Sequence, residues 1–165
     1  MDIKGWLKKY KKEIITYAAF IVGTLLLGFA SSVFVSIGME SYKALVKPPL
    51  SPPEILFPIA WSILYTLMGV SVATVYLKGD KVTKKAAVKV YLLQLFVNLA
   101  WPLFFFALGL YLFSFLWIAL LIVLVIAMII IFYSASKNAA LLQLPYLAWL
   151  TFAAYLNLAI FSLNN

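Results

Sequence analysis

The sequence contains no cysteine, no histidine and no arginine. Without these side chains the protein has no disulfide, no thiol nucleophile, and no zinc or haem ligation by cysteine or histidine. Charge is scarce, since only 11% of the 165 residues are charged. The five acidic residues lie far apart in the sequence, at Asp2, Glu13, Glu40, Glu54 and Asp80. A pair of carboxyl groups acting as general acid and base is therefore not expected.

Apolar residues dominate what remains. They make up 66% of the chain, and the mean hydropathy is +1.07. Ordinary soluble domains are about 45–50% apolar, and a chain this short has too little interior to bury such an excess. We therefore predict a protein whose main solvent is lipid. No repeat or second domain is visible, so residues 1–165 are expected to form one domain.

Five stretches are long and apolar enough to cross a bilayer, which takes about 20 residues in a helix. A tight connection around Gly109 separates the third stretch from the fourth. The five stretches are residues 14–37, 55–77, 88–107, 110–133 and 139–163. The fold class is accordingly an all-α integral membrane bundle of five transmembrane helices.

The lysines predict the orientation of this bundle. Eleven of the 13 lysines precede the first stretch or lie in or beside the second and fourth connections, whereas only Lys43 and Lys47 lie on the other side. The positive-inside rule then places the N-terminus in the cytoplasm and the C-terminus outside. The lysine clusters suit lipid headgroups, and no nucleic-acid partner is expected. The membrane is expected to be a prokaryotic plasma membrane, with an organelle membrane as the alternative.

The connection between the first two stretches is rich in proline. Five of the seven prolines lie between Pro48 and Pro58. Proline fixes φ and removes a hydrogen-bond donor, so this segment is stiff and cannot continue a helix. We predict a proline-rich lid here, with a rigid spacer as the alternative.

Polar and aromatic residues recur at helical spacing within three of the stretches. Uncharged amides in lipid are expected to face other helices. They could either hold helices together or contact a ligand, and an aromatic pocket would suit a flat, apolar ligand. The residues concerned are Trp61 and Tyr65 in the second stretch, Gln94, Asn98 and Trp101 in the third, and Tyr146, Trp149, Ala153 and Asn157 in the fifth. Pro102, which directly follows Trp101, is expected to disturb the third helix.

These stretches resemble a known family. The runs KPPLSPPEILFPIAWSILYTLMG, QLFVNLAWPLFFF and LPYLAWLTFAAYLNLAIFSLN are similar to the translocator protein family, also called tryptophan-rich sensory proteins. The resemblance covers essentially the whole chain. It implies a five-helix bundle, often dimeric, that binds porphyrins and other bulky hydrophobic molecules near the lid. It implies no required cofactor or metal.

The resemblance also implies ligand-binding residues. These are Tyr42 on the lid, and Trp61, Tyr65, Asn98, Trp101, Trp149, Ala153 and Asn157 within the helices, with Tyr146 added from its spacing. Some lid positions depart from the family pattern, because Ser41, Leu50 and Ile55 stand where tryptophans are common. A lid with less aromatic surface predicts weaker porphyrin binding. No basic residue follows Tyr155, so sterol binding through that motif is not expected.

Three functions follow from these observations. The first is a porphyrin-binding membrane protein that acts as a sensor or transporter. The second is light-dependent degradation of bound porphyrin, for which the oxidisable side chains of Trp61 and Trp149 are the catalytic candidates. The third is a regulatory membrane partner without a small ligand. Small residues four apart would allow close helix packing or dimerisation in that case: Ala19 and Gly23, Gly28 and Ser32, and Gly69 and Ala73.

Overall fold

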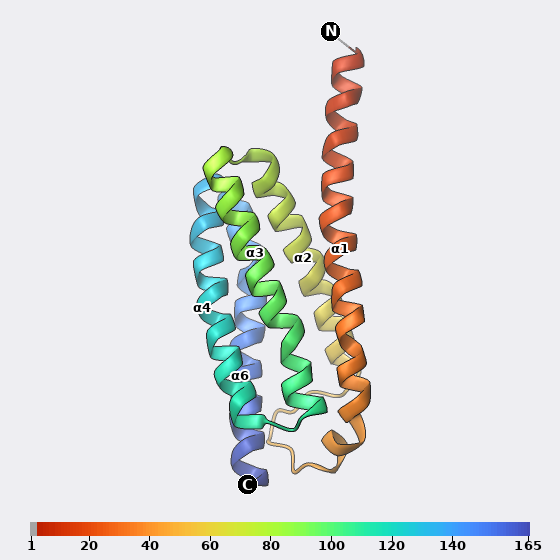
Figure 1. The fold of residues 1–165 in the computed structure, drawn as a ribbon, viewed down its shortest axis with the longest axis vertical. Coiled ribbons are helices and arrows are strands. Elements are labelled where there is room, and N and C mark those ends of the chain that lie inside the picture. The colour runs from red at the N-terminus through yellow and green to blue at the C-terminus, as the bar shows by residue number, and fades with distance from the viewer. Residues whose placement is uncertain (1–2) are drawn as a thin grey trace.

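Helices account for nearly the whole chain (Figure 1). The computed structural model describes the backbone of residues 3–165 and the side chains of residues 10–165. In chain order the elements are α1 (Ile3–Ala44), α2 (Leu56–Lys78), α3 (Lys81–Pro102), the π-helix η1 (Leu103–Ala107), α4 (Tyr111–Ala135), α5 (Lys137–Leu141) and α6 (Leu144–Asn164). Within the described part of the chain, five segments are long and apolar enough to cross a membrane, which confirms the predicted five-span fold.

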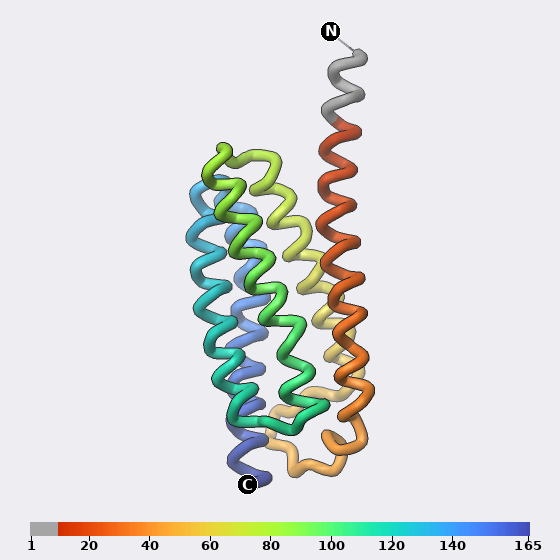
Figure 2. Tube along the Cα trace, viewed as in Figure 1, coloured from red at the N-terminus to blue at the C-terminus, as the bar shows by residue number. Residues whose placement is uncertain are grey.

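The helices run side by side along one axis. The α1–α2 loop and the C-terminus lie at one end of the bundle, which we call the loop end, and the N-terminus lies at the other (Figures 1 and 2). The main packing partners are α1 with α2 and η1, α3 with α4, and α4 with α6. Neither α1 nor α2 packs extensively on α6. Large aromatic side chains instead bridge α2 and α6, and they form the walls of the site described below.

Uncharged amide groups lie inside the bundle, and many large apolar side chains lie on its outer surface. Gln94 and Asn98 are at most 2% exposed, whereas Phe29 is 79% and Phe96 67% exposed. Water would favour the reverse arrangement, because exposed apolar surface is costly there. In lipid, the amides need internal partners and the outer surface needs none. The distribution agrees with a membrane protein.

Pro102 changes the helix that contains it. A proline inside a helix has no N–H and clashes with the carbonyl one turn earlier. The chain continues as η1, where Leu108 N donates to Leu103 O at 3.0 Å. Gly109, at φ +62°, then turns the chain into α4. Both the disturbance at Pro102 and the glycine turn match the sequence-based expectation.

Two helix boundaries differ from the prediction. α1 continues to Ala44, so Tyr42 lies on the last turn of this helix and not on the connecting loop, where we had placed it. The fifth span is not one helix, because α5 ends at Leu141 and Pro145 begins α6 two turns into the predicted stretch. Proline is favoured in the first turn of a helix, where its missing N–H has no partner to lose.

The short α2–α3 connection is fixed by a helix cap. The Asp80 carboxylate accepts hydrogen bonds from Val82 N at 2.8 Å and from Thr83 N at 2.9 Å, and the Thr83 hydroxyl also donates to it at 2.9 Å. Side-chain acceptors of this kind satisfy the unpaired N–H groups at a helix start. The bonds from Thr83 and Val82 hold the pKa of Asp80 below its ordinary value.

Candidate ligand-binding site

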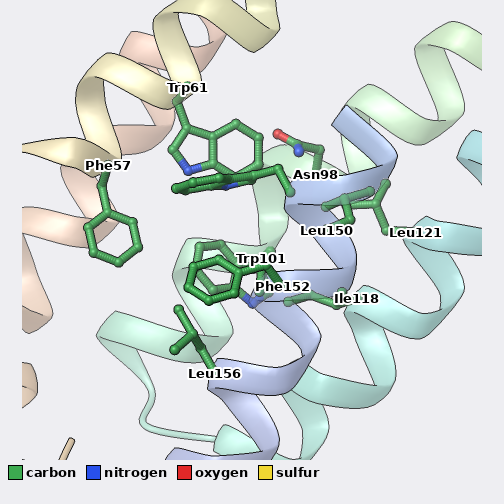
Figure 3. A pocket seen from close by; sticks show the side chains of 11 residues that line it. Phe57, Trp61, Asn98, Trp101, Ile118, Leu121, Leu150, Phe152 and Leu156 are labelled. Atoms are coloured by element: carbon green, nitrogen blue, oxygen red, sulfur yellow. The ribbon is translucent and has the colours of Figure 1, made fainter. Parts of the chain in front are cut away.

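Two spaces inside the bundle share one wall. The larger, which we call the α1–α2 cavity, has a volume of about 770 Å³ and lies among α1, α2, α3 and η1. The smaller, which we call the inner hollow, has about 20 Å³ and lies among α2, α3, α4 and α6. Four residues line both: Phe57, Trp61, Asn98 and Trp101. Figure 3 shows these side chains converging on the inner hollow from α2 and α3.

Stacked aromatic rings form the shared wall. The Trp61 ring stacks on Tyr65 with centroids 5.3 Å apart, and it meets Tyr146 of α6 edge-on at 6.2 Å. On α3, the Trp101 ring stacks on Phe105 at 5.2 Å. Phe57 reaches Trp149 of α6 at 6.3 Å. Aromatic rings therefore fill the space that the backbones of α2 and α6 leave open.

A chain of hydrogen bonds runs behind this wall. The Tyr65 hydroxyl donates to Asn98 Oδ1 at 2.9 Å, and Asn98 Nδ2 donates to the Tyr146 hydroxyl at 2.8 Å. Tyr146 then donates to Gln94 Oε1 at 3.1 Å, and Gln94 Nε2 lies 3.7 Å from the Met68 sulfur. The chain joins α2, α3 and α6 in a region of low dielectric, where such bonds are strong and reinforce one another. It fixes the orientation of Tyr65 and Asn98 at the cavity wall.

The tryptophans differ in whether the indole N–H donates a hydrogen bond to a protein acceptor. Trp101 donates to Asn157 Oδ1 at 3.2 Å, and Trp117 donates to Val97 O at 2.7 Å. Among the residues whose side chains the structure describes, Trp61 and Trp149 donate to no protein acceptor. Both side chains are only partly buried, so the structure does not require a protein partner for this group. Trp61 and Trp149 therefore retain a donor for a bound molecule.

The predicted ligand-binding residues occupy three kinds of position. Five line the α1–α2 cavity: Tyr42, Trp61, Tyr65, Asn98 and Trp101. Trp149 and Ala153 line only the inner hollow. Tyr146 and Asn157 line neither space, because Tyr146 belongs to the hydrogen-bond chain and Asn157 accepts from Trp101 while donating to Ala153 O at 2.7 Å. Their geometry is that of groups that hold helices together.

Sequence reasoning did not include α1 among the site residues beyond Tyr42. The structure lines the α1–α2 cavity with four small residues of this helix, Gly28, Ser31, Ser32 and Ser36. Their spacing of three and four residues places them on one face of a helix. That spacing was visible in the sequence, but we interpreted Gly28 and Ser32 only as a helix-packing pair.

The α1–α2 loop (residues 45–55) is fastened to α6 at the loop end. Asn164 makes two hydrogen bonds with the backbone of Val46, at 2.9 and 3.0 Å. The Tyr155 hydroxyl donates to Pro49 O at 3.1 Å. Lys47 lies 3.8 Å from the Glu54 carboxylate and 4.6 Å from the centre of the Tyr42 ring. Glu54 lines the α1–α2 cavity, so the one carboxylate at its wall faces a lysine.

Comparison with known proteins agrees with this architecture. The sequence model of the TspO/MBR family matches residues 20–163, which include every helix that lines the site. The chain belongs to the TspO/MBR family. This result confirms the resemblance stated from the sequence motifs.

Relatives of this TspO/MBR protein occur in distant organisms. The tryptophan-rich protein TspO of Chlorobaculum tepidum is 39% identical over 155 residues, covering 93% of this chain and 98% of the relative. Protein CrtK of Rhodobacter capsulatus is 35% identical over 131 residues, with 74% and 78% covered. The human translocator protein is 35% identical over 132 residues, with 78% and 77% covered.

Proposed function

We propose that this protein binds porphyrins or similarly flat, bulky hydrophobic molecules in the α1–α2 cavity. The observation that carries this proposal is a cavity of about 770 Å³ with a wall of stacked aromatic rings. Pockets for ligands of drug size have volumes of about 300–1,000 Å³. The inner hollow, at about 20 Å³, is large enough for a water molecule and too small for such a ligand.

The chemistry of the wall supports a flat ligand with a few polar groups. Trp61, Tyr65 and Trp101 offer ring faces for stacking. The indole N–H of Trp61 is available to donate, and the Tyr65 hydroxyl can accept because its own proton is given to Asn98. A ligand held in this way would suit a sensor or a carrier. No lysine and no acidic residue lies within residues 14–37 of α1 or in α2 before Lys78, so these helical walls offer no proton-coupling carboxylate or amine, and Glu54 lines the cavity only from the α1–α2 loop.

Titration with protoporphyrin in lipid nanodiscs, followed by quenching of tryptophan fluorescence, tests the proposal. We expect saturable quenching that Trp61→Phe and Tyr65→Phe both weaken. Trp117→Phe is the matched control, because it removes a tryptophan outside both spaces and should leave the affinity unchanged. Quenching that rises linearly with porphyrin and is equal in all variants would indicate partition into lipid and would refute the proposal.

Trp149→Phe and Ala153→Phe measure how far the ligand extends. Both residues line the inner hollow and not the α1–α2 cavity. If the ligand stays in the cavity, these variants should bind nearly as tightly as the wild type. If it displaces the Trp61 ring and enters the hollow, Ala153→Phe should weaken binding, because the added ring fills the available space.

Light-dependent degradation of the bound porphyrin is a second candidate function. The observation that favours it is the position of Trp61, whose oxidisable ring lines both spaces and stacks on Tyr65. Illumination of the complex in air should then consume porphyrin faster than illumination of free porphyrin in empty nanodiscs. Trp61→Phe should remove the difference. Equal rates with and without protein would exclude this activity.

We also propose the predicted topology and a homodimer as properties to be tested. Of the small residues considered for packing, Gly28 and Gly69 contact Tyr65 and Ile21 within the same chain, whereas a side chain at Gly23 would meet no atom within 4 Å. The Gly23 face of α1 is therefore the candidate for contact with a second copy. Gly23→Leu should shift the mass of the protein in nanodiscs to that of a monomer if this face is used.

A further inference from the structure

The outer wall of the α1–α2 cavity is incomplete. Val22, Leu26 and Phe29 line the cavity, yet they are 51%, 63% and 79% exposed. On the opposite wall, Tyr65, Asn98 and Trp101 are at most 8% exposed. All six residues lie within apolar segments long enough to cross the membrane. The cavity therefore extends from the buried polar chain to the surface that faces the bilayer.

Close backbone contacts bound this opening at its two ends, one between α1 and α2 and the other between α1 and η1. Toward the N-terminal end, a side-chain carbon added at Gly69 would lie 2.6 Å from the Ile21 backbone, so the two helices touch there. Toward the loop end, the corresponding carbon at Gly38 would lie against the backbone of Phe106 in η1. Between these contacts Gly28 packs on the Tyr65 ring, and Ser31, Ser32 and Ser36 are small, so space remains between α1 and the inner wall.

Hydroxyl groups line the opening on both helices. Ser31, Ser32 and Ser36 on α1, and Ser62 on α2, each donate to a carbonyl of their own helix at 2.7–3.3 Å. Their protons are thus satisfied in lipid without a partner on another helix. Their oxygens keep lone pairs that can accept a hydrogen bond from a passing molecule. The side chains at the opening can therefore contact lipid tails, and they can also accept hydrogen bonds from a molecule that carries polar groups.

At the loop end, by contrast, specific contacts hold the chain in place. The α1–α2 loop is held to α6 through Asn164 and Tyr155, and Lys47 pairs with Glu54 above the cavity. We propose that ligands reach the cavity sideways from the bilayer, between α1 and α2, while the loop stays fastened. This inference rests on the proposed binding function. It adds that the ligand belongs to a class of molecules that partition into the bilayer before they bind to the protein.

Kinetics of porphyrin binding in nanodiscs can test the route separately from the site. Ser32→Phe should narrow the opening and slow dissociation as well as association, by about tenfold each, because the ligand passes the same gap in both directions. A variant that had only lost binding contacts would instead release the ligand faster. Phe29→Ala should accelerate both steps. Val123→Phe, on the bilayer-facing surface of α4, is the matched control and should change neither rate.

A cross-link at the loop end completes the test. The chain has no native cysteine, so Val46→Cys combined with Asn164→Cys can be joined by a short bifunctional maleimide without side reactions. Unchanged association in the cross-linked protein is the expected result. Slower association after cross-linking, or a Ser32→Phe variant that loses affinity at an unchanged dissociation rate, would overturn the lateral route. Absence of saturable binding in the wild type would instead refute the proposed function.

Discussion

The α3–α4–α6 side of the bundle and the α1 side are built differently. Half of the most apolar window of the third span is buried inside the protein, compared with 11% for the first span. Ile118, Leu121 and Met128 of α4 are at most 1% exposed, whereas α1 contributes mainly small residues and a few aromatic rings to the interior. The first side is a packed scaffold that carries the polar chain. The second packs along α2 and η1 largely through small residues, and it leaves room for a ligand between the helices.

The difference teaches how a membrane protein can keep a large internal space. Lipid provides no hydrophobic drive to close a gap between helices, so packing quality alone decides where helices meet. Small residues on α1 allow close contact at Gly38 and Gly28 but fill little volume between those points. Rigid aromatic rings on α2 and α3 then define the inner surface.

Gly38→Ala should break this arrangement most severely. The added carbon would collide with the Phe106 carbonyl oxygen, which is backbone and cannot rotate away. We expect α1 to separate from η1 at a cost of about 1–3 kcal/mol, typical of overpacking. A lower melting temperature in detergent would show this. Gly23→Ala is the control, since its new carbon meets no atom within 4 Å. Equal melting temperatures of both variants would contradict the view that the close contact at Gly38 holds α1 against η1.

The polar chain offers a second test, this time of the scaffold. Gln94→Leu removes the acceptor of Tyr146 without touching either space, and Asn98→Leu removes the link between Tyr65 and Tyr146 at the cavity wall. Each should lower stability by about 1 kcal/mol, the scale of such bonds in membranes. Only Asn98→Leu should also weaken porphyrin binding. Thermal unfolding and titration of the same samples separate the two effects, and equal loss of affinity would contradict the distinction.

Glu54→Gln tests the role of the charge at the loop end of the α1–α2 cavity. Lys47 would lose its partner carboxylate and become available to a carboxylate of the ligand. Both side chains are partly exposed, so the gain is expected to be at most about 1 kcal/mol, or about fivefold in Kd. The gain should shrink as salt is raised, and a porphyrin diester should show none. A diester that gains equally would mean that the substitution acts through the loop and not through charge.

The smallest effect is expected at the opposite end, at Asp80. Its hydrogen bonds, chiefly with Thr83, hold its pKa below the ordinary value of 3.8. The stability that this cap supplies is therefore fully present above pH 4 and is lost as the pH falls through the lowered pKa. Asp80→Asn keeps an amide acceptor but no titration. Melting curves between pH 6 and pH 3 should show the wild type losing more stability than this variant, and parallel curves would contradict the assignment.

The sequence was sufficient for the number of spans because hydropathy and length report directly on lipid as solvent. It was also sufficient for the helix change at Pro102 and the turn at Gly109, since these depend on the local chemistry of proline and glycine. The grouping of Trp61 with Tyr65 followed from helical spacing alone.

The rest depended on tertiary packing. Periodicity shows which residues share a face, but not which helix that face meets. For this reason the sequence could not show that Asn157 and Asn98 have different roles. Asn157 accepts a hydrogen bond from the indole of Trp101, whereas Asn98 lies at the cavity wall. The same limit hid the serines of α1. Tyr42 was misplaced because no breaker precedes Pro48, and α1 continues to Ala44.

The hydrogen bonds of the chain all run in one direction, and this determines where the cavity wall offers an acceptor and where it offers a donor. From Tyr65 to Gln94 every donor points away from the cavity, so Tyr65 shows an incoming molecule only its lone pairs. Trp61, stacked on the same ring, shows it only a proton. A ligand with one donor and one acceptor can satisfy both residues in one orientation, and reversal would set proton against proton. The wall would thus distinguish the two ends of a molecule that its flat aromatic rings alone could not tell apart.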